Sequence, residues 1–229
     1  MRLLICLLAL LLSEVSLVAQ QVKLVQLKII PFFSNTSASI LDTTFHFNTS
    51  DSIRFETVKF YVSAIELYHH SQKAWKEKNS FHLIDAAQEK SNTILLNIPK
   101  TLDFDSIRFN IGIDSSTNSA GVLGGDLDPT KGMYWTWQSG YINVKLEGTS
   151  NLVHSLNHAF EFHLGGYMIP FETIQNISRP CADSNEIKVY VDLKQFITSF
   201  NLQETHHVMS PNADAVKLSK LLTRSFFVK

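Results

Sequence analysis

An alternation of apolar and polar side chains over residues 106–113 (SIRFNIGI) constrains the fold more than any other feature of the chain. The odd-numbered positions hold Ile or Phe, and the positions between them hold Arg, Asn and Gly. A period of two residues is typical of a strand with one face in the core. The same alternation occurs in residues 159–164 (AFEFHL) and 187–193 (IKVYVDL). These segments predict strands of a sheet that buries one face.

The remaining periodic segments indicate more strands and one helix. Residues 58–68 (VKFYVSAIELY) are apolar on both parities, which predicts a central strand buried on both faces. Residues 212 to about 226 carry apolar side chains at helical spacing, after Ser210 and Pro211, which are typical of a helix start. No strand–helix–strand alternation occurs. We therefore expect a mainly β fold, an antiparallel β-sandwich with a short C-terminal helix. Further segments with strand character are residues 22–30, 43–47 and 137–147.

The first 19 residues (MRLLICLLALLLSEVSLVA) have the pattern of a secretory signal peptide. One Arg precedes an apolar run over residues 3–12, and small residues precede the expected cleavage after Ala19. A membrane anchor is the alternative, but this run is shorter than the roughly 20 residues that a spanning helix needs. We expect residues 1–19 to be a signal peptide and residues 20–229 to form a single exported domain. No transmembrane segment is expected after cleavage.

Composition excludes several functional classes. The formal net charge of −1 argues against a nucleic-acid partner, which requires a basic face. Cys6 lies in the predicted signal peptide, so Cys181 is left alone and no intramolecular disulfide is expected. The chain has no Gly-x-Ser-x-Gly elbow, no His-Glu-x-x-His helix and no phosphate-binding Gly loop. We therefore expect a binding protein and not an enzyme.

Aromatic residues gather in residues 124–148 (GGDLDPTKGMYWTWQSGYINVKLEG), after a long Ser/Gly/Asn loop. Trp135 and Trp137 are two residues apart, so in an extended strand they face the same side. Three interpretations remain open: a buried aromatic cluster, a stacking platform for flat ligands, and a redox site, because indole is the most easily oxidised aromatic side chain. Asp126 and Asp128 precede them and are read as turn formers, since the rest of a calcium loop is missing.

Two histidines are candidate metal ligands. His163 has the parity opposite to Phe162 and Leu164 and precedes two glycines, so we expect it on the non-core face with little obstruction. His46 has the same relation to the phenylalanines beside it. Imidazole is a donor that suits copper or zinc, although a solvated surface histidine is the simpler interpretation of each. The adjacent pairs 69–70 and 206–207 are not expected to bind bidentately, because neighbours on a strand point to opposite sides.

Four blocks of the sequence resemble the MbnP-like copper-binding proteins of bacteria. They are residues 59–63 (KFYVS), residues 109–114 (FNIGID) with the Asn at 118, residues 127–148, and residues 162–166 (FHLGG). The third block, with GMYWTWQSGYINVKLEG, is the most specific, and the likeness spans nearly the whole chain after residue 19. The resemblance implies a mainly β protein exported to the periplasm or exterior of a bacterium. It also implies that the protein binds copper.

In such proteins a MauG-like dihaem peroxidase oxidises a Trp to kynurenine, which holds copper together with histidine. Trp135 and Trp137 match the Trp pair of the family, and His163 matches its His before the Gly pair. Some members also carry a His directly after the Asn of the preceding loop, where this chain has Ser119. His46 is a candidate substitute from another strand. An oxidised indole gains an amine and a ketone, donors that the intact ring lacks.

Two functional hypotheses follow. The first is copper acquisition or handling at a site built from kynurenine and His163. The second is a metal-free surface module whose Trp and Tyr side chains dock a glycan or protein partner.

Overall fold

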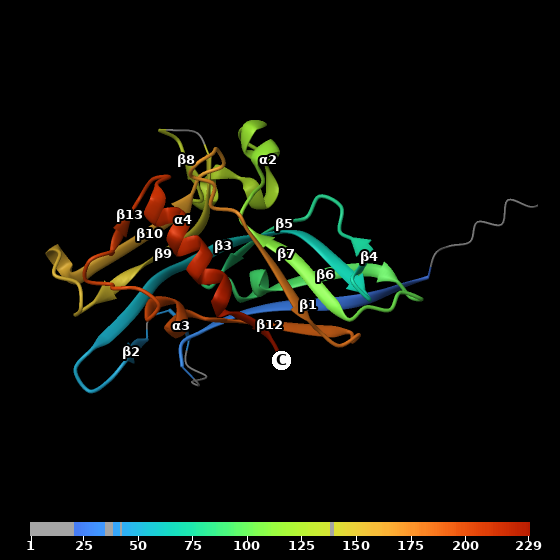
Figure 1. Ribbon diagram of the computed structural model, residues 1–229, viewed down its shortest axis with the longest axis horizontal. Coiled ribbons are helices and arrows are strands. Elements are labelled where there is room, and N and C mark those ends of the chain that lie inside the picture. The colour runs from blue at the N-terminus through green and yellow to red at the C-terminus, as the bar shows by residue number, and fades with distance from the viewer. Residues whose placement is uncertain (1–20, 35–38, 42, 138–139) are drawn as a thin grey trace, which may run out of the picture.

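The computed structural model describes residues 21–34, 39–41, 43–137 and 140–229 (Figure 1). The predicted signal peptide, residues 1–19, lies outside this part of the chain. The strands are β1 (Val22–Phe32), β2 (Thr44–His46), β3 (Ser52–His69), β4 (Gln72–Lys76), β5 (Phe81–Asp85), β6 (Thr93–Pro99), β7 (Ser106–Ile111), β8 (Tyr134–Trp135), β9 (Gly140–Ser150), β10 (Ala159–Gly165), β11 (Gln175–Pro180), β12 (Glu186–Asp192), β13 (His207–Val208) and β14 (Phe226–Val228). The α-helices are α2 (Ser115–Ser119), α3 (Leu193–Ile197) and α4 (Ala213–Leu222), and the short 3-10 helices are η1 (Glu89–Asn92), η2 (Gly125–Leu127), η3 (Pro129–Lys131), η4 (Leu156–His158) and η5 (Thr223–Ser225).

The strands form two sheets that pack face to face, so the predicted sandwich is confirmed. The smaller sheet has the order β14-β12-β1-β6, and the larger one contains β11-β7-β3-β9-β10-β13 with β2, β4, β5 and β8 beside this path. Most pairs are antiparallel, but β1 with β12 and β10 with β13 are parallel. The long connections between these partners allow the parallel pairing, which a two-residue hairpin cannot provide.

The core lies between the two sheets and follows the alternation of the strands. One hydrophobic cluster joins Val25, Leu27 and Ile29 of β1 to Phe60 of β3 and Phe109 of β7. The polar residues between these positions point away from the core, as the period of two predicts. Burial of each such side chain stabilises the fold by about 1.5–3 kcal/mol, which offsets the lack of a disulfide.

Strand β3 is the centre of the larger sheet. It pairs with β2, β4, β5, β7 and β9 along its length, which explains why its apolar residues occupy both parities. The sequence pattern predicted a strand over residues 58–68, and β3 begins earlier, at Ser52, and continues through a bulge between Phe55 and Thr57. After β3 the chain turns back as β4, whose side chains are mostly exposed.

The C-terminal helix is confirmed, with a different start and end. Helix α4 runs over residues 213–222 and packs Ala215, Leu218 and Leu222 into the core beside β10. Its N-cap is Asn212, whose side-chain oxygen accepts a 2.8 Å hydrogen bond from the Ala215 amide, rather than Ser210. Within the described residues, no helix has the length and apolar character needed to cross a membrane.

Strand β9 runs from β8, which contains Trp135, to the part of β3 that pairs with β2. Gly140 at its start pairs with Trp135 of β8, and Ser150 at its end pairs with Ile53 of β3, next to β2. In Figure 1, β8 and α2 lie together at the top, and β2 lies at the lower left. We call residues 124–137 the Trp segment, which therefore sits at one end of the sandwich.

Candidate functional site

The Trp segment folds across the outer face of the larger sheet and closes a second hydrophobic cluster there. We call this the Trp135 cluster: Tyr61, Leu83, Ile113, Leu127, Met133, Trp135, Tyr141 and Ile142. Tyr134 packs against it, with its ring centroid 5.1 Å from that of Tyr141. Leu127, Met133 and Trp135 thus cover the apolar side chains on the outer face of β3 at this end.

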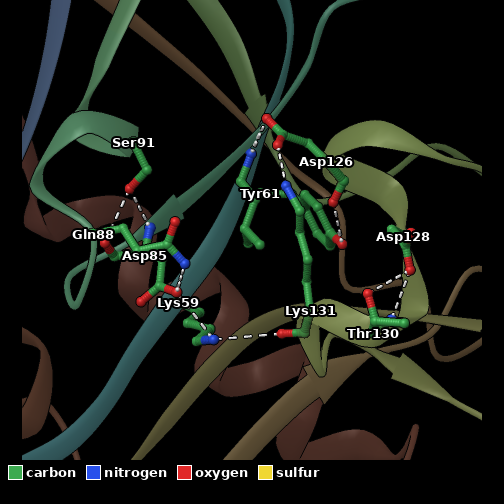
Figure 2. Close-up of polar contacts among 10 residues, drawn as sticks. Lys59, Tyr61, Asp85, Gln88, Ser91, Asp126, Asp128, Thr130 and Lys131 are labelled. Atoms are coloured by element: carbon green, nitrogen blue, oxygen red, sulfur yellow. Dashed lines mark hydrogen bonds and ion pairs between the residues drawn. The ribbon is translucent and has the colours of Figure 1, made fainter.

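Polar contacts hold the acidic loop before the tryptophans onto the sheet (Figure 2). The Asp126 carboxylate accepts a hydrogen bond from the Leu83 amide at 3.1 Å and pairs with Lys131 at 2.5 Å. The Tyr61 hydroxyl donates to the Asp126 carbonyl at 3.1 Å, and its burial raises its pKa. Lys59 joins the loop to the sheet from below: it donates to the Lys131 carbonyl and forms an ion pair with Asp85.

Asp126 and Asp128 act as turn formers, as expected from the sequence. The Asp128 carboxylate accepts hydrogen bonds from the Thr130 amide and hydroxyl, at 2.8 and 2.7 Å, and so caps η3. These bonds lower the pKa of the Asp128 carboxyl. Both carboxylates are engaged in fixing the loop, which places the two tryptophans that follow it.

Trp135 and Trp137 are in contact but differ in environment. Trp135 lies in β8 and is 5% exposed, whereas Trp137 lies in the turn after β8 and is 64% exposed. Their ring centroids are 6.0 Å apart with an angle of 52° between the planes. The shared flat surface expected of an extended pair does not form, because the strand ends at Trp135. One indole is packed in the protein and its neighbour is open to a partner.

Gly165 explains how Trp135 fits against β10. A Cβ added at Gly165 would lie 2.6 Å from the Cη2 and Cζ3 atoms of Trp135 and 2.7 Å from the Tyr141 carbonyl. No side chain fits there without displacing the indole. The benzene edge of Trp135 therefore lies directly on the β10 backbone, two residues from His163 along the same strand.

His163 is buried, which corrects the expectation that it stands unobstructed. Its side chain is on the outer face of β10 by parity, but the residue is only 7% exposed. Glu147 of the neighbouring β9 holds the ring: the Nε2 atom lies 2.7 Å from the Glu147 Oε1 atom. The sheet register produces this contact, since His163 pairs with Lys145 and Glu147 is two residues further along β9.

The hydrogen bond from His163 is the largest reason why the pKa of the Glu147 carboxyl falls to about 2. Thr57 and Lys145 lower that pKa further, while burial opposes the shift. Glu147 is therefore ionised at neutral pH and accepts a hydrogen bond from the Nε2–H group of His163. In a neutral imidazole the lone pair is then on Nδ1, the nitrogen that can bind a metal.

His46 lies far from this site. It pairs with Ser52 at the other end of the larger sheet and its side chain is exposed. Trp135 pairs with Gly140 at the start of β9, ten residues or about 33 Å from Ser150, which lies beside β2 through Ile53. His163 pairs with Lys145, five residues or about 17 Å from Ser150, and β9 and β3 lie between its strand and β2. The structure brings Trp135, Trp137 and His163 to one end of the sandwich and does not bring His46 to them.

Asn118 and Ser119, in helix α2, lie close to the start of β9. Asn118 of α2 is buried and its side-chain oxygen accepts a 2.9 Å hydrogen bond from the Tyr141 amide. Its side-chain amide donates to the Ile113 and Asp114 carbonyls. The next residue, Ser119, is exposed and donates to the Ser115 carbonyl at 2.8 Å. Ser119 thus follows Asn118, which fixes the start of β9, and its own hydroxyl is hydrogen-bonded within α2.

The adjacent pair His69 and His70 departs from the expectation that neighbours diverge. His70 has a φ of 48°, and this turn brings the two ring centroids to 4.0 Å. Asp105 lies 3.9 and 3.6 Å from their Nδ1 atoms, beyond hydrogen-bond range. In the part of the chain that the structure describes, no three His, Cys, Asp or Glu side chains are grouped so as to hold a metal ion.

A pocket of about 420 Å³ opens beside Trp135, and sequence reasoning did not find it. The loop after β10 forms its wall, and this loop carries no periodic pattern or recognised motif that could have signalled it. Glu147 was also missed as a functional residue, although it shares the polar parity of β9. The residues lining the pocket are Trp135, Gly140, Gly166, Tyr167, Met168, Ile169, Pro170, Phe171 and Pro211.

Comparison with known proteins agrees with this arrangement. The sequence profile of the MbnP family matches residues 23–210. The solved structure of MbnP from Methylosinus trichosporium superposes with a TM-score of 0.60 at 13% identity, over 86% of this chain and 87% of that one. No curated protein matches the sequence. Because the profile covers most of the described sandwich, including the Trp segment and His163, the chain belongs to the MbnP family.

Proposed function

We propose that this protein is an exported copper-binding protein, not an enzyme, whose site combines His163 with a kynurenine made from Trp135. It acts in copper acquisition or handling. The observation that carries the proposal is the hydrogen bond between His163 and Glu147 beside the Trp135 ring. Membership of the MbnP family supports the link to copper, and residues 1–19 supply the export signal.

The geometry around His163 suits a metal ligand. A ligating histidine usually donates its other ring N–H to a carboxylate, which fixes the tautomer and makes the ligand more basic. Glu147 fills that place at 2.7 Å and is itself held by Lys145, whose ammonium lies 3.4 Å from the same oxygen. An ionised carboxylate thus fixes the orientation of the buried His163 ring. The Nδ1 atom of His163 is the donor that we assign to copper.

Trp135 is the better candidate for oxidation to the second ligand, because its ring lies on β10 near His163. Intact indole has no lone pair to offer in its ring plane, so the indole itself does not fit a metal. Conversion to kynurenine breaks the C2–C3 bond, releases C2 as formate and adds the ketone oxygen, with two equivalents of hydrogen peroxide reduced to water overall. The product carries an aniline nitrogen and a ketone oxygen. With one imidazole they form a low-coordinate site of the kind that copper accepts.

The oxidant that we assign is a MauG-like dihaem peroxidase. Trp137 is 64% exposed and in contact with Trp135, so an external oxidising partner can approach the pair without unfolding the segment. The family resemblance implies a further His directly after Asn118 in some members, and this chain has Ser119 there. We therefore assign no copper ligand to position 119.

Intact mass and peptide mapping of protein purified from its native host test the modification. We expect the peptide containing Trp135 to have lost one carbon and gained one oxygen, and the peptide containing Trp75 to be unchanged. Unmodified Trp135 and Trp137 in protein that binds no copper would refute the proposal.

Copper titration against a competing chelator tests the ligand. His163→Ala is expected to lower copper affinity more than a hundredfold, and Glu147→Gln by about 10–100-fold because it removes the carboxylate behind the imidazole. His46→Ala serves as the matched control and should bind as the unaltered protein does. Equal affinity of the His163→Ala variant would remove that residue from the site.

A metal-free docking module is the second candidate, and the exposure of Trp137 favours it. A large aromatic side chain on a turn is a common anchor for a protein or glycan partner. Trp137→Ala would then abolish capture of that partner, and the unaltered protein would capture it without binding copper.

A further inference from the structure

The pocket beside Trp135 is formed by the loop that follows β10 and by Pro211 before α4. Its volume of about 420 Å³ lies within the range of small-molecule sites, about 300–1,000 Å³. None of the residues assigned to copper above other than Trp135 lines it. The pocket therefore shares Trp135 with the proposed copper site and is otherwise lined by different residues.

The loop that forms the wall is held in place by its own hydrogen bonds. The Thr173 amide and hydroxyl both donate to the Gly166 carbonyl, at 3.0 and 3.3 Å. The side-chain amide of Asn143 on β9 donates to the Thr173 hydroxyl at 2.9 Å, and all three groups are buried. The Phe171 amide donates to the Met168 carbonyl at 2.8 Å. The pocket is thus already formed before a ligand binds.

Two glycines let the walls of the pocket pack closely against each other. Gly166 has a φ of 135°, and a Cβ there would lie 2.2 Å from the Phe171 carbonyl oxygen. A Cβ on Gly140 would lie 3.3 Å from the Tyr167 ring. Three of the lining residues, Trp135, Tyr167 and Phe171, are aromatic. Planar ligands stack on such rings, and each aromatic contact adds about 0.5–1.5 kcal/mol beyond area burial.

The lining also defines the charge of the ligand. Of the described residues that line the pocket, none is Asp, Glu, Lys, Arg or His, so no formal charge faces the ligand. An ionised ligand would lose hydration without gaining a partner, which costs several kcal/mol. At the rim, Met168 and Ile169 are 65% and 85% exposed, which leaves apolar surface for a ligand to cover. The pocket walls therefore suit a ligand that is both uncharged and mainly apolar.

We propose that this pocket is a binding site for a neutral, planar, mainly apolar small molecule that stacks beside Trp135. The site goes beyond copper handling and needs neither copper nor kynurenine. A bound molecule covers the edge of Trp135 that faces the pocket and the rim side chains of Met168 and Ile169.

Titration of the metal-free mature chain with N-phenyl-1-naphthylamine tests this site. The probe is neutral and gains fluorescence in an apolar environment. We expect saturable binding of one probe per chain. In the double variant Trp75→Phe, Trp137→Phe, Trp135 is the remaining tryptophan, and its emission should fall as energy transfers to the probe. The anionic relative 1-anilinonaphthalene-8-sulfonate should bind at least tenfold more weakly.

Two aspartate variants locate the probe. Ile169→Asp places a charge on the exposed rim and is expected to lower probe affinity at least tenfold. Leu95→Asp is the matched control: Leu95 is 53% exposed on the smaller sheet, and the change should leave affinity unaltered. Absence of saturable binding, or an equal loss in both variants, overturns the proposal. So does light scattering that shows a dimer dissociated by Ile169→Asp, since a second copy would then cover the pocket. Copper is absent throughout, so these outcomes do not bear on copper handling.

Discussion

Gly165 and Glu147 show how single positions on neighbouring strands place the Trp and His side chains. The missing side chain at Gly165 admits the indole edge of Trp135, and the Glu147 carboxylate holds the imidazole of His163. Trp135, Trp137 and His163 were identified from the sequence by type and parity. Glu147 was not, because its contact with His163 depends on the register between β9 and β10, which no local pattern encodes.

Gly165→Ala is expected to destabilise the fold by about 1–3 kcal/mol, because its methyl group would overlap the Trp135 ring and the Tyr141 carbonyl. Urea denaturation measures the change. Gly124→Ala is the control, since a Cβ there meets no atom within 4 Å and its φ of −98° suits any residue. Equal midpoints for the Gly165→Ala variant and the unaltered protein would show that the indole does not rest on β10.

The Glu147 carboxyl also makes stability depend on pH. Its pKa is about 2 in the folded protein, against an ordinary value of 4.5. A depressed pKa stabilises the fold above pH 4.5, and this contribution is lost as the pH falls from 4.5 towards 2. Urea midpoints at pH 5 and pH 3 should therefore fall less steeply in Glu147→Gln than in the unaltered protein. Parallel pH profiles would mean that Glu147 gains nothing from its contact with His163.

At the scale of elements, the strands with clear alternation were predictable and the short ones were not. β7, β10 and β12 follow from period-two patterns, whereas β13 and β14 span only two or three residues and form because a neighbouring strand offers an edge. The first residue of helix α4 was also not predicted correctly from the local sequence. Ser210 and Pro211 have the right chemistry for an N-terminus, yet the backbone places Asn212 at the cap.

Asn212→Ala is expected to cost about 1 kcal/mol of stability by removing the hydrogen bond to the Ala215 amide. Ser210→Ala should change the free energy of unfolding by less than about 0.5 kcal/mol, as is usual for surface substitutions. Chemical denaturation of both variants compares the two positions. A larger loss in the Ser210→Ala variant would contradict the assigned cap.

At the scale of the whole molecule, the sandwich class followed from the absence of strand–helix–strand alternation. The partner of each strand did not, because pairs such as β1 with β12 join residues about 160 positions apart. The pocket beside Trp135 could not be predicted from the sequence for a similar reason. It needs Gly140, Gly166 and Pro211 together, and these come from three separate parts of the chain.

Phe226 links the two sheets, since its ring lies 6.0 Å from Phe60 of β3 and 6.1 Å from Phe109 of β7. Phe226→Ala should cost about 3–5 kcal/mol, the range for a buried Phe. Phe227 is the neighbouring control, because it points to the outer face and stacks on Tyr190. Phe227→Ala should cost distinctly less in thermal or urea unfolding. Equal losses would mean that the β14 edge, rather than its inward ring, joins the sheets.

The place of β1 has a consequence for when the protein can fold. β1 lies between β6 and β12 in the smaller sheet, and β14 completes that sheet from the last residues of the chain. The first strand to be made must therefore wait for partners made much later. Contacts of such long sequence separation slow folding, typically to milliseconds or seconds. A newly made chain would thus keep β1 unpaired on one side until β12 has emerged, and the smaller sheet is complete only when β14 has joined it.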